Sequence, residues 1–302
     1  MKTIAIIMTV RNRRNITKRG IESIINANKN KYKLYFYITD DGSTDGTEEI
    51  LQEIKEKNKN CIFIITKADG NRYWCGGMRI SYGKALENEN IDYYLLANDD
   101  VEFFENFLDT IMNDYNEISN KYDKVLLTAP VKDKITGEVT YGAFNIDFKK
   151  IYKYFRHPKH LLEPNSKVQE CNLINGNCVL INKTVAKHLG NLDDRFAHIA
   201  GDRMYGLKLI EMGGKCFLAS EYVGYCSSNP IKGTWQDESL SPIKRIKLKH
   251  DIKVHPPKTY SIYLKKVFGK KWIGYFIYQY IMIFVTSLKY QINKRKYGEK
   301  SL

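Results

Sequence analysis

The side chains best suited to chemistry stand where an apolar run stops on two adjacent carboxylates. Residues Tyr93 to Ala97 are bulky and apolar, which is typical of a buried strand, and Asn98-Asp99-Asp100 follows them directly. Adjacent carboxylates are costly to keep ionised unless a cation neutralises them. Two interpretations fit. A divalent cation that carries a phosphorylated ligand binds here, because Mg²⁺ and Mn²⁺ prefer oxygen ligands, or an aspartate caps the following helix.

Two further loops offer groups that could hold a nucleotide. The segment 34–39 is expected to be a strand, and it ends on Asp40-Asp41-Gly42-Ser43-Thr44-Asp45-Gly46-Thr47. Asp41 is suited to accept a hydrogen bond from a base imide N–H, and an Asx-turn with the glycine and serine after it is the alternative. Arg72 and Arg79 follow a third strand and are suited to bind phosphates.

Alternating strands and helices must position these loops. Strands are expected at 2–10, 34–39, 61–66 and 93–97, and helices at 15–27, at 47–57 and from the 71–77 loop to residue 89. This alternation from residue 1 to about 122 predicts a mostly parallel, doubly wound α/β sheet with right-handed crossovers. The carboxyl ends of the strands meet at one edge, where such sheets bind ligands. Neither the dinucleotide fingerprint GxGxxG nor a P-loop follows any of these strands.

The second half of the chain contributes one more acidic candidate. A strand at 125–131, a hairpin at 134–139 with a Thr136-Gly137 turn, and a loop over the basic, aromatic segment 144–164 are expected. The strand-like run 171–181 is interrupted by Asn175-Gly176-Asn177. Asp202 then stands at the head of a helix, either as a cap stabilised by the helix dipole or as a general base aimed into a cleft.

Composition indicates a folded chain with a basic C-terminal tail. The 302 residues, 43% of them hydrophobic, are enough for a substantial core. The net charge of +14 is uneven: residues 1–242 hold 33 Lys and Arg against 32 Asp and Glu, whereas 243–302 hold 15 against two. The six cysteines show no zinc-like spacing, so we expect reduced thiols in a cytosolic protein. The apolar run at 4–8 is too short for a signal peptide.

The motifs from Thr3 to about Ser228 together resemble those of the inverting glycosyltransferases of family 2, which have the GT-A fold, and in particular rhamnosyl- and galactosyltransferase-like members. The resemblance rests on the order in which the motifs occur. They are Thr9-Val10-Arg11-Asn12-Arg13, the acidic loop at 40–47, Trp74-Cys75-Gly76-Gly77, Asn98-Asp99-Asp100 in the place of the DxD motif, Asn175-Gly176-Asn177 in the acceptor-side loop, and 192–209 in the place of the segment with the catalytic base.

The resemblance implies a role for each matched residue. Thr9 and Asp41 would contact the nucleobase, and Asp202 would be the catalytic base. Asp99 and Asp100 would lie at the ribose and at a Mn²⁺ or Mg²⁺ ion on the diphosphate, with Asp100 as the metal ligand. The other substrate-binding residues that it implies are Arg11, Arg72, Trp74, Gly77, Arg79, Asn98, Asn175 and Gly176. A flat indole suits a sugar ring, and burial in the core is the alternative for the tryptophan.

The chain departs from the family pattern at three places. Asn98 replaces the first acid of the DxD motif, so the metal would depend on Asp100 alone. Gly201 and Met204 replace the acid pair that is usual around the base, which leaves Asp202 as the sole carboxylate there. Tyr225-Cys226 occupies the approximate place of a metal-binding histidine, and we expect a buried structural thiol rather than a metal ligand.

The resemblance thus implies a metal-dependent inverting glycosyltransferase. It would move a sugar from a UDP- or dTDP-sugar donor to a hydroxyl of a glycan or lipid-linked saccharide, in bacterial surface polysaccharide synthesis. We expect a GT-A domain at 1–242, with a nucleotide-sugar half at 1–122 and an acceptor and catalytic-base half at 123–242. A helical, basic and aromatic extension follows at 243–302.

This extension joins clusters of lysine and arginine to the uncharged run from Trp272 to Leu288. The run has 17 residues and contains Gln279, Thr286 and Ser287. Basic flanks on both sides favour a helix that lies in the interface of the cytoplasmic membrane and attaches the protein peripherally. Packing on the catalytic domain or on a second subunit of a homo-oligomer, and a true membrane span, are the alternatives.

Three other functions compete with this interpretation. Basic segments with interleaved aromatic residues occur in nucleic-acid-binding proteins, but the near-neutral 1–242 segment and the acidic strand ends argue against a nucleic-acid partner. A nucleotidyltransferase should carry a glycine- and lysine-rich triphosphate loop near the first strand, and no glycine precedes Gly20. A non-catalytic relative is consistent with Asn98 and Gly201.

Overall fold

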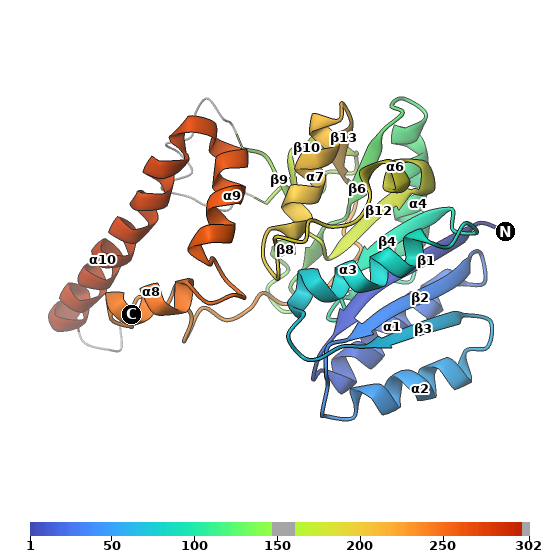
Figure 1. Cartoon of the computed structure of the whole chain (residues 1–302), viewed down its shortest axis with the longest axis horizontal. Coiled ribbons are helices and arrows are strands. Elements are labelled where there is room, and N and C mark those ends of the chain that lie inside the picture. The colour runs from blue at the N-terminus through green and yellow to red at the C-terminus, as the bar shows by residue number, and fades with distance from the viewer. Residues whose placement is uncertain (147–160, 298–302) are drawn as a thin grey trace. The chain divides into compact units, whose positions relative to one another are not determined.

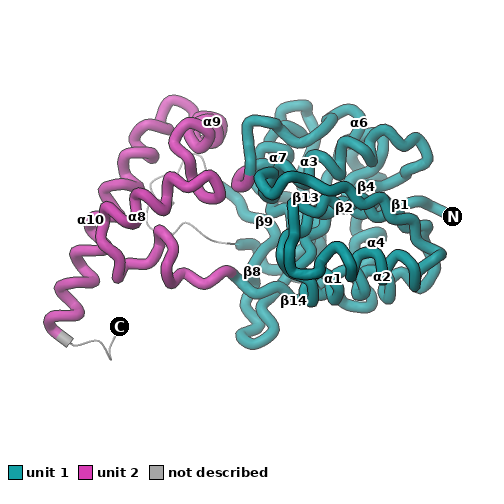
Figure 2. The backbone as a smooth tube through the Cα atoms, turned by 60° about the horizontal axis from the view of Figure 1, so that its bottom comes forward, with its two compact units in different colours: residues 1–146, 160–197, 201–228 teal, residues 147–159, 198–200, 229–302 magenta. Residues whose placement is uncertain are grey.

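The computed structural model describes residues 1–146 and 161–297, which form two compact units (Figure 2). Of these residues, unit 1 holds 1–146, 161–197 and 201–228, and unit 2 holds 198–200 and 229–297. The boundary at residue 228 reflects how the chain packs, whereas the boundary expected at residue 242 reflects the change in charge along the sequence. Most of the loop expected at 144–164 lies outside the described residues.

Unit 1 is built on an eight-stranded sheet with helices on both faces (Figure 1). The strand order is β10 (Gln169–Cys171), β13 (Lys215–Leu218), β6 (Val125–Thr128), β12 (Cys178–Asn182), β4 (Tyr93–Ala97), β1 (Thr3–Val10), β2 (Lys33–Asp40) and β3 (Ile62–Lys67). The neighbours β4, β1, β2 and β3 are parallel, which confirms the sheet predicted from the alternation. β12 runs antiparallel to β4 and β6, so the turn before β12 lies at the carboxyl end of β4.

Helices cover both faces because the central strands are apolar on both sides. Ile4 to Met8 of β1 are fully buried, which is typical of an inner parallel strand. On one face, α1 (Arg14–Asn28), α2 (Thr47–Lys57) and α4 (Phe107–Ser119) contribute apolar side chains to the core. On the other, α3 (Tyr73–Leu86) packs on β1 and β2, and α6 (Lys183–Leu189) and α7 (Gly201–Glu211) lie beyond it.

Several short strands complete unit 1. The structure also corrects three expectations, which concern one strand, one turn and one helix. The segment expected as one strand at 125–131 divides at Pro130, since β7 (Val131–Lys132) joins a second sheet with β8 (Val139–Tyr141), β14 (Gly224–Tyr225) and β5 (Glu102–Phe103). The predicted hairpin forms between β7 and β8, but the loop 133–138 replaces the two-residue turn because Asp133 binds the N–H groups of Ile135 and Thr136. The helix expected to reach residue 89 ends at Leu86. A two-stranded pair is formed by β9 (Ala143–Phe144) and β11 (Leu173–Ile174).

Unit 2 consists mainly of helices, as expected for the basic extension. They are α8 (Pro242–Lys249), α9 (Pro257–Phe268), the 3-10 turn η1 (Gly269–Lys271) and α10 (Trp272–Tyr297). Both α8 and α9 pack against α10. None of the helices within the described residues is long and apolar enough to cross a bilayer.

Candidate active site

The loops after β1, β2 and β3 are joined by hydrogen bonds at the edge where the sequence predicted a ligand. Asn12 donates its N–H to Ser43 Oγ (3.0 Å) and accepts from the N–H of Thr44 (2.7 Å). Asp45 accepts from the N–H groups of Arg14 (3.0 Å) and Thr47 (3.1 Å), and these contacts lower its pKa. The first two loops therefore hold each other, which fixes the starts of α1 and α2.

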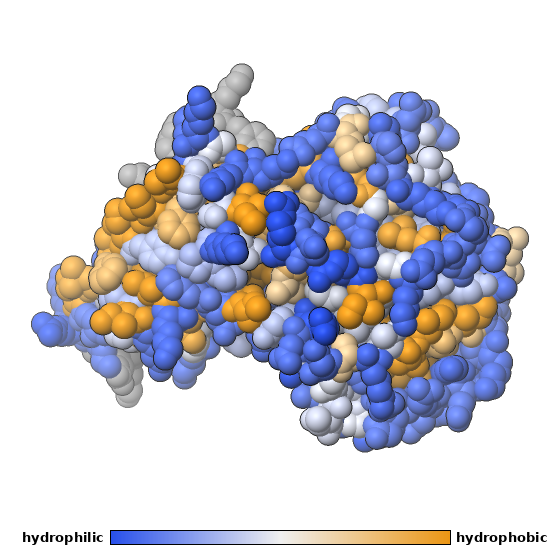
Figure 3. Space-filling model, in the orientation of Figure 1, coloured by the Kyte–Doolittle hydropathy of each residue, from blue (hydrophilic) through white to orange (hydrophobic). Residues whose placement is uncertain are grey.

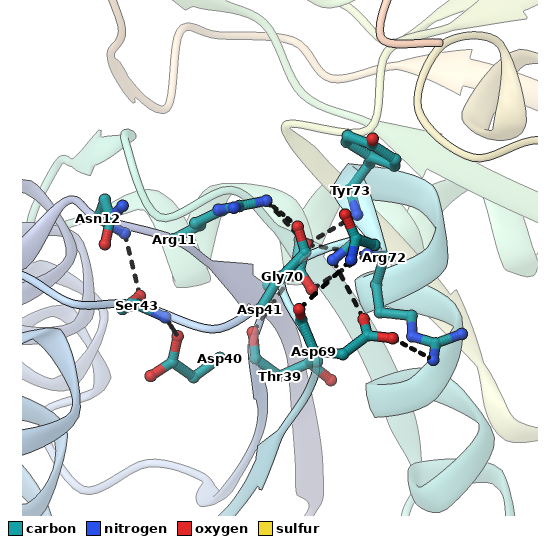
Figure 4. Close-up of polar contacts among 12 residues, drawn as sticks. Arg11, Asn12, Thr39, Asp40, Asp41, Ser43, Asp69, Gly70, Arg72 and Tyr73 are labelled. Carbon is teal, nitrogen blue, oxygen red and sulfur yellow. Dashed lines mark hydrogen bonds and ion pairs between the residues drawn. The ribbon is translucent and has the colours of Figure 1, made fainter.

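Asp41 is buried, and its carboxylate binds the start of α3 (Figure 4). It accepts from the N–H groups of Arg72 (3.0 Å) and Tyr73 (2.9 Å), so it satisfies free donors at that helix terminus. Arg11 reaches the same place: it lies 3.8 Å from Asp41 and donates to the carbonyl of Gly70. The Asx-turn considered for Asp41 does not form, because the Ser43 N–H donates to the neighbouring Asp40 (2.9 Å).

The loop between β3 and α3 is shorter than the sequence suggested. Because α3 begins at Tyr73, Trp74 and Gly77 stand in the first two turns of a helix rather than in the expected 71–77 loop. Tyr73 has a φ of 56°, a left-handed conformation that is strained for a bulky residue. The backbone N–H groups of Arg72 and Tyr73, which Asp41 binds, lie at this bend.

Arg13 bridges the two carboxylates that follow β4. Its Nη1 donates to Asp100 (2.8 Å) and to Asp99 (3.2 Å), and Thr17 of α1 donates its hydroxyl to Asp99 (2.8 Å). Asp99 is buried, and burial, together with the charge of Asp100, raises the pKa of Asp99 to about 6. The guanidinium offsets this cost by supplying a positive charge to both aspartates.

Asp100 is the more exposed of the pair and is the candidate metal ligand. One of its oxygens accepts from Arg13, and the other lies 3.7 Å from the Cys226 thiol, which donates to it. Burial and the charge of Asp100 raise the pKa of Cys226, so this buried thiol is protonated, as expected for a structural cysteine. Within residues 1–146 and 161–297, no three His, Cys, Asp or Glu side chains are grouped to hold a metal ion.

Asp202 faces the turn that precedes β12. As the second residue of α7, it accepts from the N–H groups of Gly176 (2.8 Å) and Arg203 (2.8 Å). The two donors fix the direction of the carboxylate. A Cβ on Gly201 would lie 2.2 Å from the sulfur of Cys75, so no acidic side chain could stand beside Asp202 at that position.

Trp74 connects Asp202 to the aspartate pair. Its indole N–H donates to Asn98 Oδ1 (2.7 Å), and Asn98 in turn donates its backbone N–H to the carbonyl of Asn177 (3.1 Å). A Cβ on Gly176 would lie 2.6 Å from the indole ring and 3.2 Å from Cβ of Asp202. The residue that replaces the first acid of the DxD motif thus holds the tryptophan against the turn that binds Asp202.

Three other expected residues lie at the same edge but make contacts within the protein. Thr9 donates its hydroxyl to the carbonyl of Thr39 (3.2 Å), and the absence of a side chain at Gly77 lets α3 approach it, because a Cβ there would lie 2.1 Å from Thr9 Oγ1. The backbone N–H of Asn175 donates to the Gly142 carbonyl (2.7 Å). Their roles toward a substrate remain predictions.

The two arginines expected at phosphates differ in their surroundings. Arg72 is half exposed and pairs with Asp69 (2.8 Å) at the mouth of the loop. Arg79 is turned toward the carbonyls of Asp193 and Phe196, each 3.5 Å away, in the segment that leads to α7. Arg72 is therefore free to turn to a ligand by breaking one exposed ion pair, whereas Arg79 supports the backbone near Asp202.

Sequence reasoning missed Arg13 and Thr17 as parts of this site. Arg13 lies within the matched Thr9-Val10-Arg11-Asn12-Arg13 motif, so the signal was present, but its spacing gave no indication that it would reach Asp99. The contact spans more than eighty residues and depends on β1 and β4 being neighbours in the sheet.

The sequence also matches a known protein family. Residues 5–190 match the family described as "Glycosyl transferase family 2". No curated protein sequence matches the chain significantly.

Several solved structures share the fold at low sequence identity. A mannosyltransferase from Pyrobaculum calidifontis, in complex with GDP-Man and Mn²⁺, is 13% identical, with a TM-score of 0.53 over 98% of this chain and 76% of that one. GalNAc-T7 with UDP, GalNAc and Mn²⁺ is 15% identical, with a TM-score of 0.58 over 88% of this chain and 48% of that one. S. aureus TarS 1–349 with UDP-GlcNAc is 12% identical, with a TM-score of 0.52 over 89% and 73%.

These similarities confirm the α/β fold of GT-A type that the motif order predicted. The family match covers more than half of the chain and contains the loops after β1, β2 and β4 and the turn that binds Asp202. The chain belongs to glycosyl transferase family 2.

Proposed function

We propose that the protein is an inverting glycosyltransferase that uses a UDP- or dTDP-sugar and a hydroxyl acceptor. The observation that carries the proposal is the arrangement of three carboxylates in unit 1. Asp99 and Asp100 follow β4, and Asp202 is linked to them through Gly176, Trp74 and Asn98. A transfer with inversion needs such an arrangement, because the leaving diphosphate and the base act on opposite sides of the reacting carbon.

Asp202 would accept the proton of the acceptor hydroxyl while the oxygen attacks the anomeric carbon. The carboxylate accepts one N–H on each oxygen, so a lone pair stays available on each. The new bond forms as the bond to the diphosphate breaks, and one displacement gives inversion. Trp74 supplies a flat apolar face beside Asp202 that suits a sugar ring.

A Mg²⁺ or Mn²⁺ ion fits this site if it arrives with the donor. Asp100 offers one accessible carboxylate of hard oxygen atoms, and one carboxylate combined with substrate phosphates is a usual way to bind Mg²⁺. When bound, the ion would stabilise the charge that develops on the leaving diphosphate. Arg13 already neutralises both aspartates, so it would share or yield Asp100 when the metal binds.

The donor nucleotide and the cellular setting follow from different observations. Two of the structural neighbours hold UDP or UDP-GlcNAc and one holds GDP-Man, so they support a nucleotide-diphosphate donor without selecting one. Transfer of rhamnose or galactose to a glycan or lipid-linked saccharide in bacterial surface polysaccharide synthesis follows from the sequence resemblance. We propose a cytoplasmic location for this reaction, where nucleotide sugars are made.

Asp202→Asn tests the proposed base. The amide keeps an oxygen for the N–H of Gly176 but cannot take up a proton, so turnover should fall on the order of 10²-fold or more. Donor binding, measured as the shift in melting temperature with UDP- or dTDP-sugar and Mn²⁺, should persist. Asp109→Asn is the matched control, because Asp109 also stands in the first turn of a helix and pairs only with exposed Lys31. Unchanged turnover in Asp202→Asn would refute the assignment.

A further inference from the structure

Three polar residues of α10, Gln279, Thr286 and Ser287, face the interior of unit 2, where they bind two buried basic side chains of α8. Arg245 is almost fully buried and donates to the Ile283 carbonyl (3.0 Å), to Thr286 Oγ1 (2.8 Å) and to Ser287 Oγ (2.8 Å). Lys249 is fully buried and donates to Gln279 (2.5 Å). The polar atoms that interrupt the apolar run of α10 are therefore used inside the unit.

The opposite face of α10 carries large apolar side chains that are about half exposed to solvent. Their exposed fractions range from 51% to 62%, and they are Ile273, Ile277, Ile281, Phe284, Leu288 and Ile292. At 3.6 residues per turn, these six positions fall within an arc of about 100° along about 28 Å of helix. Figure 3 shows hydrophobic side chains gathered over α10. We call this surface the α10 stripe.

Basic side chains lie at both ends of the α10 stripe. Lys270 and Lys271 precede the helix, and Lys289 and Arg295 lie beside its last turns, all of them exposed. The whole 243–302 segment contains only two acidic residues, Asp251 and Glu299. An apolar stripe with cationic flanks matches the chemistry of an anionic lipid surface, whose acyl chains take up apolar side chains and whose headgroups attract lysine and arginine.

A second copy of the chain fits the α10 stripe less well. The spacing of the stripe is four, four, three, four and four residues, which departs from the alternation of three and four that a two-helix seam requires. Two copies would also bring together segments that each hold 15 Lys and Arg against two Asp and Glu. The stripe is apolar and the residues at its ends are positively charged, which favours a planar, negatively charged partner.

We propose that the α10 stripe docks unit 2 onto the surface of an anionic lipid bilayer, with the helix axis in the plane of the membrane. Lys270, Lys271, Lys289 and Arg295 are the cations that meet the headgroups. Arg245 and Lys249 take no part, because Thr286, Ser287 and Gln279 hold them inside the unit. The docking surface does not depend on the sugar-transfer reaction, so its loss would leave turnover on a water-soluble acceptor unchanged.

Vesicle co-sedimentation of the full chain tests the proposal. Wild-type protein should bind vesicles of phosphatidylcholine mixed with phosphatidylglycerol, bind phosphatidylcholine alone more weakly, and dissociate as salt is raised. The double variant Ile277→Glu with Phe284→Glu should bind the mixed vesicles at least about tenfold more weakly, because it places charge in the stripe. Its melting temperature should stay unchanged, since both positions are exposed.

Ile135→Glu is the matched control for this experiment. Ile135 is 94% exposed in the β7–β8 loop of unit 1, so its replacement adds one glutamate, against two in the double variant, at an exposed apolar residue outside the stripe. Equal vesicle binding by the double variant and the control would overturn the proposal, as would wild-type protein that stays in the supernatant. A wild-type dimer in solution that the double variant abolishes, without vesicle binding, would assign the stripe to a second copy instead.

Discussion

Arg13 shows how a single residue sets the electrostatics of this site. Without it, two adjacent carboxylates, one of them buried, would stand at the end of β4 with no positive charge in contact from the residues that the structure describes. Such a pair repels itself and is poorly solvated, as the raised pKa of Asp99 indicates. The guanidinium suits this place because one of its nitrogens, Nη1, donates to both carboxylates and its charge is permanent.

Arg13→Ala should therefore lower the free energy of unfolding by about 1–3 kcal/mol, since it leaves a buried carboxylate without its partner. Arg13→Lys should recover part of the loss, because the ammonium ion keeps the positive charge and the donors that Nη1 supplies but lies on a shorter side chain. Urea unfolding measures both. Lys121→Ala is the control: it removes an exposed ion pair with Glu117, and its cost should stay below about 0.5 kcal/mol. Equal effects of Arg13→Ala and Lys121→Ala would show that the bridge does not stabilise the site.

Gly176 is the second position where one atom decides the geometry. In Gly176→Ala, the added Cβ would stand 2.6 Å from the Trp74 ring, so the indole or the turn that binds Asp202 must move. Displacements of this size at a reacting group typically cost about 10²-fold in rate, and we expect at least a tenfold loss of kcat. The measurement is sugar transfer under saturating donor. Gly274→Ala, where nothing lies within 4 Å of the new Cβ, should keep full activity. A fully active Gly176→Ala would show that the position of Trp74 is not needed.

At the scale of whole elements, the sequence predicted what local pattern controls. The helix expected at 47–57 is α2, and the strands after which the acidic loops come are β2 and β4. Predictions from the local sequence pattern were wrong where contacts between distant residues determine where an element begins or ends. Asp41 starts α3 at Tyr73 by binding its free N–H groups from another loop, and Pro130 separates β6 from β7 because the two strands belong to different sheets.

The candidate site divides in the same way. The motif order predicted Asp202 and the Asn175-Gly176-Asn177 turn as parts of one site, and a hydrogen bond joins Gly176 to Asp202 in the structure. The Arg13 bridge and the Trp74–Asn98 hydrogen bond could not be predicted, because each depends on which strands and helices are neighbours. Gln279, Thr286 and Ser287 are a similar case: the sequence shows them within the apolar run, but their partners on α8 are visible only in the fold.

The α8–α10 contact predicts a pH dependence of stability. Burial lowers the pKa of Lys249 to about 7, whereas a lysine in an unfolded chain titrates near about 10.4. Between these values the unfolded chain binds more protons than the folded one. The free energy of unfolding should therefore rise with pH in this window, by at most about 1.4 kcal/mol per pH unit, and this contribution should be constant below about pH 7.

Lys249→Met should abolish this rise, and the difference between wild type and variant cancels the contributions of tyrosines and cysteines. His255, Trp235 and Tyr260 face the same amine, and the variant leaves them in place. Urea unfolding by tryptophan fluorescence in a Trp74→Phe background reports unit 2, where the other two tryptophans lie. Lys247→Met, on the exposed face of α8, should keep the wild-type slope. A slope that survives in Lys249→Met would contradict the assignment.

For the molecule as a whole, charge and thiols are separated along the chain. The excess of positive charge belongs to 243–302, whereas all six cysteines lie in unit 1, free and buried. Burial raises the pKa of Cys75 to about 12 and that of Cys216 to about 12, so the reactive thiolate is rare in the folded state. Thiol reactivity therefore reports the opening of unit 1, independently of unit 2.

A disulfide reagent such as DTNB should thus react slowly with native protein and with all six thiols after denaturation. Because the proposed donor site lies in unit 1, a nucleotide that binds there should slow the reaction in proportion to the stability it adds. At a UDP or dTDP concentration of 100 times its dissociation constant, with Mn²⁺, the rate should fall by about 100-fold for thiols exposed by global opening of the unit. Inorganic diphosphate with Mn²⁺ is the control, since it lacks the base and ribose that Asp41 and Asp99 are proposed to contact, and it should protect less. Equal protection by diphosphate would remove the nucleoside from the proposed site, and no protection by either nucleotide would place the donor elsewhere in the chain.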